Sequence, residues 1–162
     1  MLQFLNAIGE IESKLSVGIA GGGEEFELLY KQIQDVRHKT LDVRLLGNLS
    51  SVEKETFMQS TKVFVFPSLM INDDVEGLPV ALLEALATNK IVVASRATNI
   101  EQMPEWEHIK CNVLLLKDPT NPFEFATILS SALQKEPKDI SPHMKRYEWL
   151  NLITEYIKLL NC

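Results

Sequence analysis

The chain has 162 residues, of which 46% are hydrophobic and 23% are charged. This balance is that of a globular domain and excludes disordered, collagen-like and fibrous proteins. Sixteen Lys and Arg residues against 22 Asp and Glu residues give a net charge of -6, so the chain lacks the overall basic charge of a nucleic-acid-binding protein. Cys111 and Cys162 have no CxxC spacing and no neighbouring histidines, which predicts free thiols and no zinc site.

Short apolar runs alternate with helical patterns along the chain, beginning with a predicted helix over residues 1–14 and a strand over 16–20. Further strands are predicted over 41–47, 63–67, 91–95 and 112–116, and further helices over 24–38, 50–60, 78–89, 123–135 and 145–160. Strands that are apolar throughout and alternate with helices indicate a mostly parallel sheet covered on both faces. The sequence therefore predicts a three-layer α/β fold.

No linker or low-complexity segment divides the chain, so we expect one domain over residues 1–162. Because the chain opens on a helix, we expect the strand of its first βα unit to be missing. The N-terminus lacks the pattern of a signal peptide, and no apolar run approaches the ~20 residues of a membrane-spanning helix. These features predict a cytoplasmic protein.

The loop after the third predicted strand is the most informative, because ligands of open parallel sheets bind at the carboxyl ends of the strands. Asp73, Asp74 and Glu76 lie just ahead of the helix that follows. Free N–H groups around Gly77 and Leu78, at the positive end of the helix dipole, predict an anion site suited to a diphosphate. The alternative is that the three acids are ordinary N-terminal residues favoured by the same dipole.

Glu84 is an acidic residue inside the otherwise apolar helical segment VALLEALA. A carboxylate in such surroundings is seldom buried without a partner. A ligand rich in hydroxyl groups could supply that partner, and a salt bridge or an exposed helix face is the alternative. Glu76 and Glu84 are separated by ~12 Å of helix rise, whereas paired glycosidase carboxylates lie ~5 to 9.5 Å apart. We therefore expect two separate contacts on one extended ligand.

Two further features are candidates for ligand contacts. Gly21, Gly22 and Gly23 follow the first strand without GxGxxG spacing, and the acidic residues after them would repel a pyrophosphate, so they are either a close approach to a ligand or only a turn. Lys90 and Arg96 flank the fourth strand, where they are either phosphate contacts or exposed loop charges.

Taken together, these motifs resemble the C-terminal, donor-binding half of a GT-B glycosyltransferase of the retaining family 4 (glycosyl transferases group 1). The resemblance spans roughly residues 15–160 and centres on EGLPVALLEALA, which is similar to the family's pair of glutamates with seven residues between them. IAGGGEE, VRLLGNLS, VFVFPS, KDPTNPFEFATIL and RYEWLNLITEYIKLL resemble other family segments in the expected order. The resemblance implies a Rossmann-like domain that forms the C-terminal half of a GT-B fold.

The resemblance also implies a role for each matching residue. Glu84 would bind the ribose hydroxyls of a nucleotide diphosphate sugar, and Glu76 would face the transferred sugar at the reacting centre as the catalytic residue. The other implied contacts are to the sugar and diphosphate from the backbone of Gly77, Leu78 and Pro79, to the nucleobase from Gly47 and Asn48, and to the phosphates or the acceptor side from Gly21, Gly22 and Gly23. The nucleotide sugar is a substrate, and neither a cofactor nor a metal ion is expected.

The implied enzyme is a glycosyltransferase of the hexosyltransferase type, acting in polysaccharide biosynthesis. It would transfer sugar to a glycan or lipid-linked acceptor held by an N-terminal domain that is missing here, and the isolated domain would be inactive. That missing half could also contact the cytoplasmic face of the membrane. Asn89 and Ile91 replace a Gly and a Pro of the family pattern, and Thr98, Asn99 and Glu101 keep only part of a donor-side loop. The alternative is therefore a non-catalytic α/β nucleotide-binding or interaction module.

Overall fold

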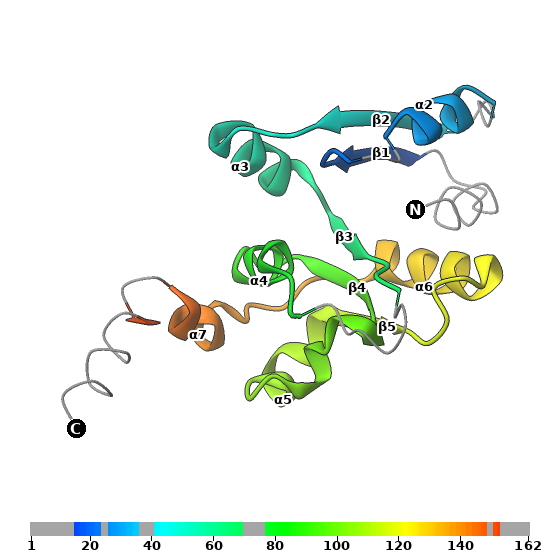
Figure 1. The fold of residues 1–162 in the computed structure, drawn as a ribbon. Coiled ribbons are helices and arrows are strands. Elements are labelled where there is room, and N and C mark those ends of the chain that lie inside the picture. Colours follow the sequence, from blue (N-terminus) through cyan, green and yellow to red (C-terminus); the bar gives the residue numbers. More distant parts are fainter. Residues whose placement is uncertain (1–14, 24–25, 36–40, 70–76, 149–150, 153–162) are drawn as a thin grey trace.

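The computed structural model describes residues 15–23, 26–35, 41–69, 77–148 and 151–152, over which strands and helices alternate (Figure 1). The strands are β1 (Leu15–Ala20), β2 (Leu41–Gly47), β3 (Val63–Phe66), β4 (Ile91–Ser95) and β5 (Val113–Leu116). The helices are α2 (Phe26–Asp35), α3 (Ser51–Ser60), α4 (Val80–Ala87), α5 (Trp106–Ile109), α6 (Pro122–Gln134) and α7 (Ser141–Met144), with short 3₁₀ turns between them. The predicted α/β class is confirmed.

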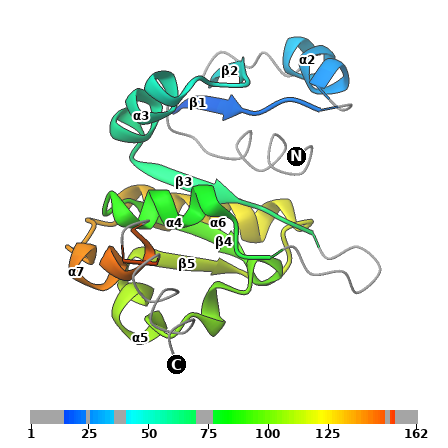
Figure 2. The same ribbon diagram turned by 60° about the vertical axis from the view of Figure 1, so that its left-hand side comes forward.

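All strand pairs of the described residues are parallel, as predicted, but they form two sheets rather than one. β1 pairs with β2, with Val17 opposite Val43. β3, β4 and β5 form a second sheet, with Phe64 opposite Val92. The two sheets are separate because no ladder of hydrogen bonds joins β1 to β3. Figure 2 shows the three arrows of the second sheet together, with β1 and β2 apart from them.

Alternate residues of β4 enter different cores, and all five residues of this strand are buried. Ile91 and Val93 pack in a core with residues of α2 and α6, including Phe125, which is fully buried. Val92 and Ala94 pack on the other side with residues of α3, α4 and α7. The sheet is therefore covered on both faces, which explains why β4 is apolar throughout.

Local sequence signals explain where several of these helices begin and end. Ser50 caps α3, accepting a hydrogen bond from the N–H of Glu53 while the Glu53 carboxylate accepts one from the N–H of Ser50. The side chain of Asn121 caps α6 in a similar position. Asn89 ends α4 in the left-handed conformation, with φ 56°, and its side-chain oxygen accepts a hydrogen bond from the N–H of Ile140 at 2.8 Å.

The helix predicted from Lys145 differs from the structure. α7 ends at Met144, residues Lys145–Tyr147 form a 3₁₀ turn, and Glu148 is extended. Asn151 and Leu152, further along the predicted helix, are helical, and the N–H of Leu152 donates to the carbonyl of Glu148 at 3.0 Å. The reason for the turn is the Glu105 carboxylate, which is nearly buried and accepts hydrogen bonds from the Tyr147 hydroxyl at 2.5 Å and from Arg146 Nη1 at 3.1 Å.

The helix predicted over residues 1–14 and the end of the last predicted helix lie outside the described residues. No helix among the described residues is long and apolar enough to span a bilayer.

Candidate functional site

A cavity of about 910 Å³ lies between β1 and β3 and extends to the helices α3 and α4. Three of the predicted contact residues line it, one from each of three separate segments. Gly21 follows β1, Asn48 follows β2, and Glu84 comes from the second turn of α4. The fold thus brings these residues to one cavity.

The glycine turns after β1 and β2 are in direct contact. The N–H of Gly21 donates to the carbonyl of Gly47 at 2.7 Å. Gly21, Gly23 and Gly47 have φ values of 120°, 143° and 64°, which glycine adopts more readily than other residues. A Cβ on Gly22 would lie 3.3 Å from the side-chain amide of Asn48. The two segments that the resemblance assigned to different parts of a nucleotide therefore form one surface.

Glu84 forms an ion pair with a residue that the sequence analysis did not identify. Lys54 Nζ on α3 lies 2.6 Å from Glu84 Oε1, and the Glu84 side chain is 33% exposed. The salt bridge, one of the two alternatives for Glu84, is therefore present. Oε2 receives no hydrogen bond from the described part of the chain, so the carboxylate keeps one free acceptor.

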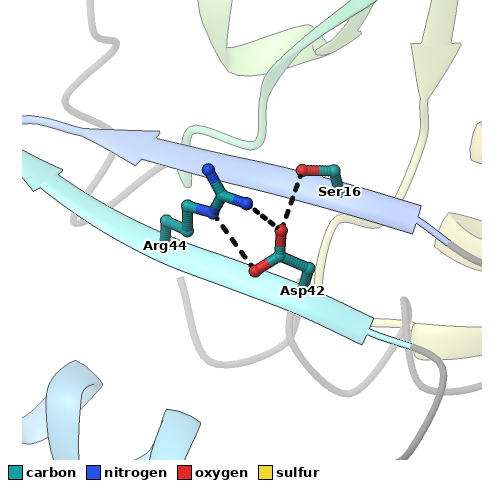
Figure 3. A network of polar contacts seen from close by, with 3 residues as sticks. All are labelled: Ser16, Asp42 and Arg44. Atoms are coloured by element: carbon teal, nitrogen blue, oxygen red, sulfur yellow. Dashed lines mark hydrogen bonds and ion pairs between the residues drawn. The ribbon is translucent and has the colours of Figure 1, made fainter.

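Arg44 also lines the cavity, and its guanidinium is bound on the first sheet. Figure 3 shows Asp42 between Ser16 of β1 and Arg44 of β2. The Asp42 carboxylate accepts hydrogen bonds from Arg44 Nη2 at 2.5 Å and from the Ser16 hydroxyl at 3.4 Å. Hydrogen bonding to Asp42, together with its charge, raises the pKa of Arg44. The two cations Arg44 and Lys54 on the cavity wall are therefore each paired with a carboxylate, Asp42 and Glu84 respectively.

The start of α4 has backbone N–H groups that are not bonded within the helix. Pro79 precedes the helix, and its carbonyl accepts the N–H groups of Leu82 and Leu83. The N–H groups of Val80 and Ala81 come before these first bonds, and Ala81 lines the cavity. Gly77 is exposed and Leu78 is half-buried.

The predicted residues ahead of this helix start, Asp73, Asp74 and Glu76, lie outside the described residues. The structure therefore places the predicted ribose contact, Glu84, and leaves the position of the predicted catalytic carboxylate as a prediction.

The side chains of the loop after β4 interact within the domain. Thr98 is fully buried and donates to the carbonyl of Ser95 at 2.8 Å, and Asn99 is left-handed with φ 54°. Arg96 pairs with Glu101 at 3.4 Å. Lys90, at the other end of β4, donates to the carbonyl of Gln59 at 2.8 Å. These contacts within the domain account for the positions of the polar side chains, so no bound phosphate is needed to explain them.

Three exposed apolar side chains lie near the carboxyl ends of the strands. Val52, Val80 and Phe123 stand at the starts of α3, α4 and α6 and are 74%, 71% and 71% exposed. Each of these helices follows a strand, so the three side chains lie on the carboxyl side of the sheets, where a ligand or another domain would approach. Within the described ranges, no group of three or more His, Cys, Asp or Glu residues could hold a metal ion.

Comparison with known proteins identifies the family and agrees with this fold. The chain is 32% identical over 98 residues to the amylovoran biosynthesis glycosyltransferase AmsK of Erwinia amylovora. That match covers 60% of this chain and 20% of the relative, so the chain spans only about a fifth of the length of the curated relative that it matches. Residues 2–147 match the sequence profile of the glycosyl transferases group 1. The chain therefore belongs to the glycosyl transferases group 1 family, of whose fold its Rossmann-like α/β arrangement is typical.

Proposed function

We propose that residues 1–162 form the donor-binding domain of a retaining glycosyltransferase, which holds a nucleotide diphosphate sugar while the sugar is transferred to a glycan or lipid-linked acceptor. The observation that carries this proposal is the meeting of Gly21, Asn48, Glu84 and Lys54 at one cavity. These residues combine close backbone approach, a free carboxylate oxygen and a cation. That combination suits a ligand with a flat base, ribose hydroxyls and phosphates.

The carboxylate of Glu84 is the proposed ribose contact. Its Oε2 atom can accept a hydrogen bond from a ribose hydroxyl while Oε1 stays paired with Lys54. Lys54 would hold the carboxylate in position. A hydrogen bond to a charged acceptor contributes about 1.5–3 kcal/mol, which corresponds to roughly 10- to 150-fold in affinity.

The diphosphate is proposed to bind at the start of α4. The N–H groups of Val80 and Ala81 lie at the positive end of the helix dipole, and Gly77 offers no side chain that would block the approach. During transfer, negative charge grows on the departing diphosphate, and fixed donors at this position would stabilise it. Glu76, just ahead of this helix, is the proposed catalytic residue at the transferred sugar.

Titration calorimetry with uridine, guanosine and adenosine diphosphates tests the proposal. We expect at least one diphosphate to bind, and its 2′,3′-dideoxy form to bind at least about tenfold more weakly. Glu84→Gln should lower the affinity for the ribonucleotide and abolish this difference. The matched control is Glu107→Gln on α5, because Glu107 is also paired with a lysine, Lys110, but does not line the cavity.

Two results would contradict the proposal: no binding of any of the three diphosphates at millimolar concentration, or equal effects of the two substitutions. The alternative function, a non-catalytic nucleotide-binding module, is favoured by the internal contacts of Thr98, Arg96 and Glu101. It predicts diphosphate binding without sugar transfer when the chain is assayed together with its acceptor domain.

A further inference from the structure

Side-chain contacts join α5 and the turn after it to α7 and the residues around it, two segments that are distant in the sequence (Figure 2). The fully buried Asn112 side chain donates to the carbonyl of Lys138 and accepts from its N–H, both at 2.8 Å. Glu105 accepts hydrogen bonds from Tyr147 and Arg146. A third contact, between two histidines, lies between these two along both segments.

The third contact is a stack of two imidazole rings, His108 on α5 and His143 on α7. Their centroids are 4.1 Å apart and their planes are inclined by 2°. His108 is exposed and His143 is half-buried, so water reaches the pair. The Cys111 thiol donates to the backbone carbonyl of His108 at 3.3 Å and does not contact the ring nitrogens. Among the described residues, neither ring nitrogen forms a hydrogen bond or an ion pair, so the rings meet through their faces.

The charge of such a stack changes within the physiological range. A free imidazole gains its proton near pH 6.5. Two neutral rings stack favourably, whereas two protonated rings place like charges about 4 Å apart and repel each other. Parallel rings also direct their nitrogen lone pairs side by side rather than towards one point, so the pair is not arranged around a shared metal ion. Acid therefore acts on this contact through charge repulsion.

The charged groups on the elements around the stack have other partners. On α5 and the turn after it, Glu107 pairs with Lys110. Ahead of α7, Asp139 accepts a hydrogen bond from the Ser141 hydroxyl at 2.7 Å. Hydrogen bonds from Ser141, together with the charge of Lys145, lower the pKa of Asp139. None of these carboxylates is bound to either imidazole, so the stack lacks a counter-ion that would offset a second proton.

The other two contacts between the segments keep their charge between pH 5 and pH 8. The Asn112 contact contains no titratable side chain. Burial alone would raise the pKa of Glu105, but hydrogen bonds from Tyr147 and Arg146 lower it below its usual value, so Glu105 stays ionised at pH 5. The pKa of Tyr147 is raised to about 12 by burial and by its hydrogen bond to Glu105. Of the three contacts, the stack alone responds to pH in this range.

We propose that the His108–His143 stack is a pH-sensitive contact that holds α7 to α5 at neutral pH and releases it in acid, when both rings carry a proton. The released form binds two protons and the stacked form binds fewer, so the contact weakens as the pH falls through the range in which imidazole is protonated. α7 also packs on α4, and Met144 is buried in the same core as Leu82. Since α4 carries Glu84, release of α7 removes packing from the helix of the candidate site.

Hydrogen exchange at pH 7.5 and pH 5.0 tests this proposal, with each rate divided by that of an unstructured chain at the same pH. The N–H of His143, which donates to the carbonyl of Ile140 at 3.0 Å, reports on α7. Its protection should fall at least about fivefold on acidification, the factor that corresponds to two unit charges about 4 Å apart in water. Protection of the α6 amides should stay unchanged, because the opening is local.

His108→Phe keeps a ring in the stack and removes one of the two charges, so the fall should disappear or reverse. His143→Phe should give the same result at the amide of residue 143, and it serves if the first variant does not fold. The matched control is Glu107→Gln, which removes a neighbouring charge on α5 and should retain the full fall. No fall in the wild type, a fall that persists in either folded phenylalanine variant, or an equal fall in the α6 amides would overturn the proposal. The measurements are made without nucleotide, so their failure is distinct from a failure of diphosphate binding.

Discussion

The Glu105 carboxylate connects the start of α5 to the segment after α7 through hydrogen bonds. Removing the hydroxyl of Tyr147 measures how much one of these bonds contributes to stability. In Tyr147→Phe the ring remains and only the donor to Glu105 Oε2 is lost. The Glu105 side chain is 11% exposed, so water can replace the lost donor only in part. A hydrogen bond to a charged group contributes about 1.5–3 kcal/mol, and we expect the free energy of unfolding to fall by this amount.

Urea denaturation and thermal unfolding at pH 7 measure this loss. For a chain of this size, 1 kcal/mol corresponds to ~2–4 °C, so the Tm of Tyr147→Phe should fall by roughly 3–12 °C. The control is Tyr30→Phe on α2, because Tyr30 is 52% exposed. Glu105→Gln combined with Tyr147→Phe should be less destabilising than the sum of the two single substitutions, since both remove the same interaction.

The pH dependence provides an independent check. Burial alone would raise the pKa of Glu105, but hydrogen bonds from Tyr147 and Arg146 outweigh it and lower the pKa below its usual value. The stabilisation is therefore complete above about pH 4.5 and is lost as the pH falls through the lowered value. Burial and the Glu105 hydrogen bond raise the pKa of Tyr147 to about 12. Stabilisation from this group is complete below about pH 10 and is lost as the pH rises towards 12.

The difference in stability between the wild type and Tyr147→Phe should therefore be flat from about pH 5 to pH 9 and shrink on both sides. A difference no larger than that of Tyr30→Phe, or one that grows on acidification, would refute the reasoning.

Three other substitutions probe the packing. Gly18→Ala places a Cβ 2.6 Å from Cε2 of Phe57, so we expect a loss of about 1–3 kcal/mol in urea denaturation and partial recovery in the double variant with Phe57→Leu. Phe125→Ala, at a fully buried ring, should lose about 3–5 kcal/mol, against less than about 0.5 kcal/mol for Phe123→Ala at a 71% exposed one. Asn89→Gly keeps the left-handed conformation and loses the side-chain hydrogen bonds, so its Tm should lie between those of the wild type and Asn89→Ala.

Local signals were sufficient to predict most elements from the sequence. Apolar runs predicted β2 and β4 at their observed bounds, and Asn89 was predicted to end α4, as observed. These features depend on neighbouring residues, so a single sequence records them. The break between β1 and β3 was not predicted, because apolar patterns identify strands and say nothing of which strands pair. The turn after α7 was also missed, because it depends on Glu105, which lies 41 and 42 residues before its two partners.

The candidate site was likewise predicted where it depends on neighbouring residues and missed where it depends on distant ones. The position of Glu84 in an apolar helix pointed to a carboxylate with a partner, and the glycine turns pointed to close backbone contact. Lys54 could not be chosen from the sequence, because its partner is 30 residues away. For Lys90 and Arg96 the sequence suggested a ligand, because both residues flank β4. In the structure, Lys90 instead donates to the carbonyl of Gln59 and Arg96 pairs with Glu101.

The exposed side chains of Val52, Val80 and Phe123 determine how firmly this side of the domain could be closed. Burying all three would contribute roughly 5–9 kcal/mol, at about 1.5–3 kcal/mol for each side chain. Bringing two bodies together costs an estimated 4–15 kcal/mol of lost motion. A cover held by these three contacts alone would therefore open and close readily, without any unfolding of the domain.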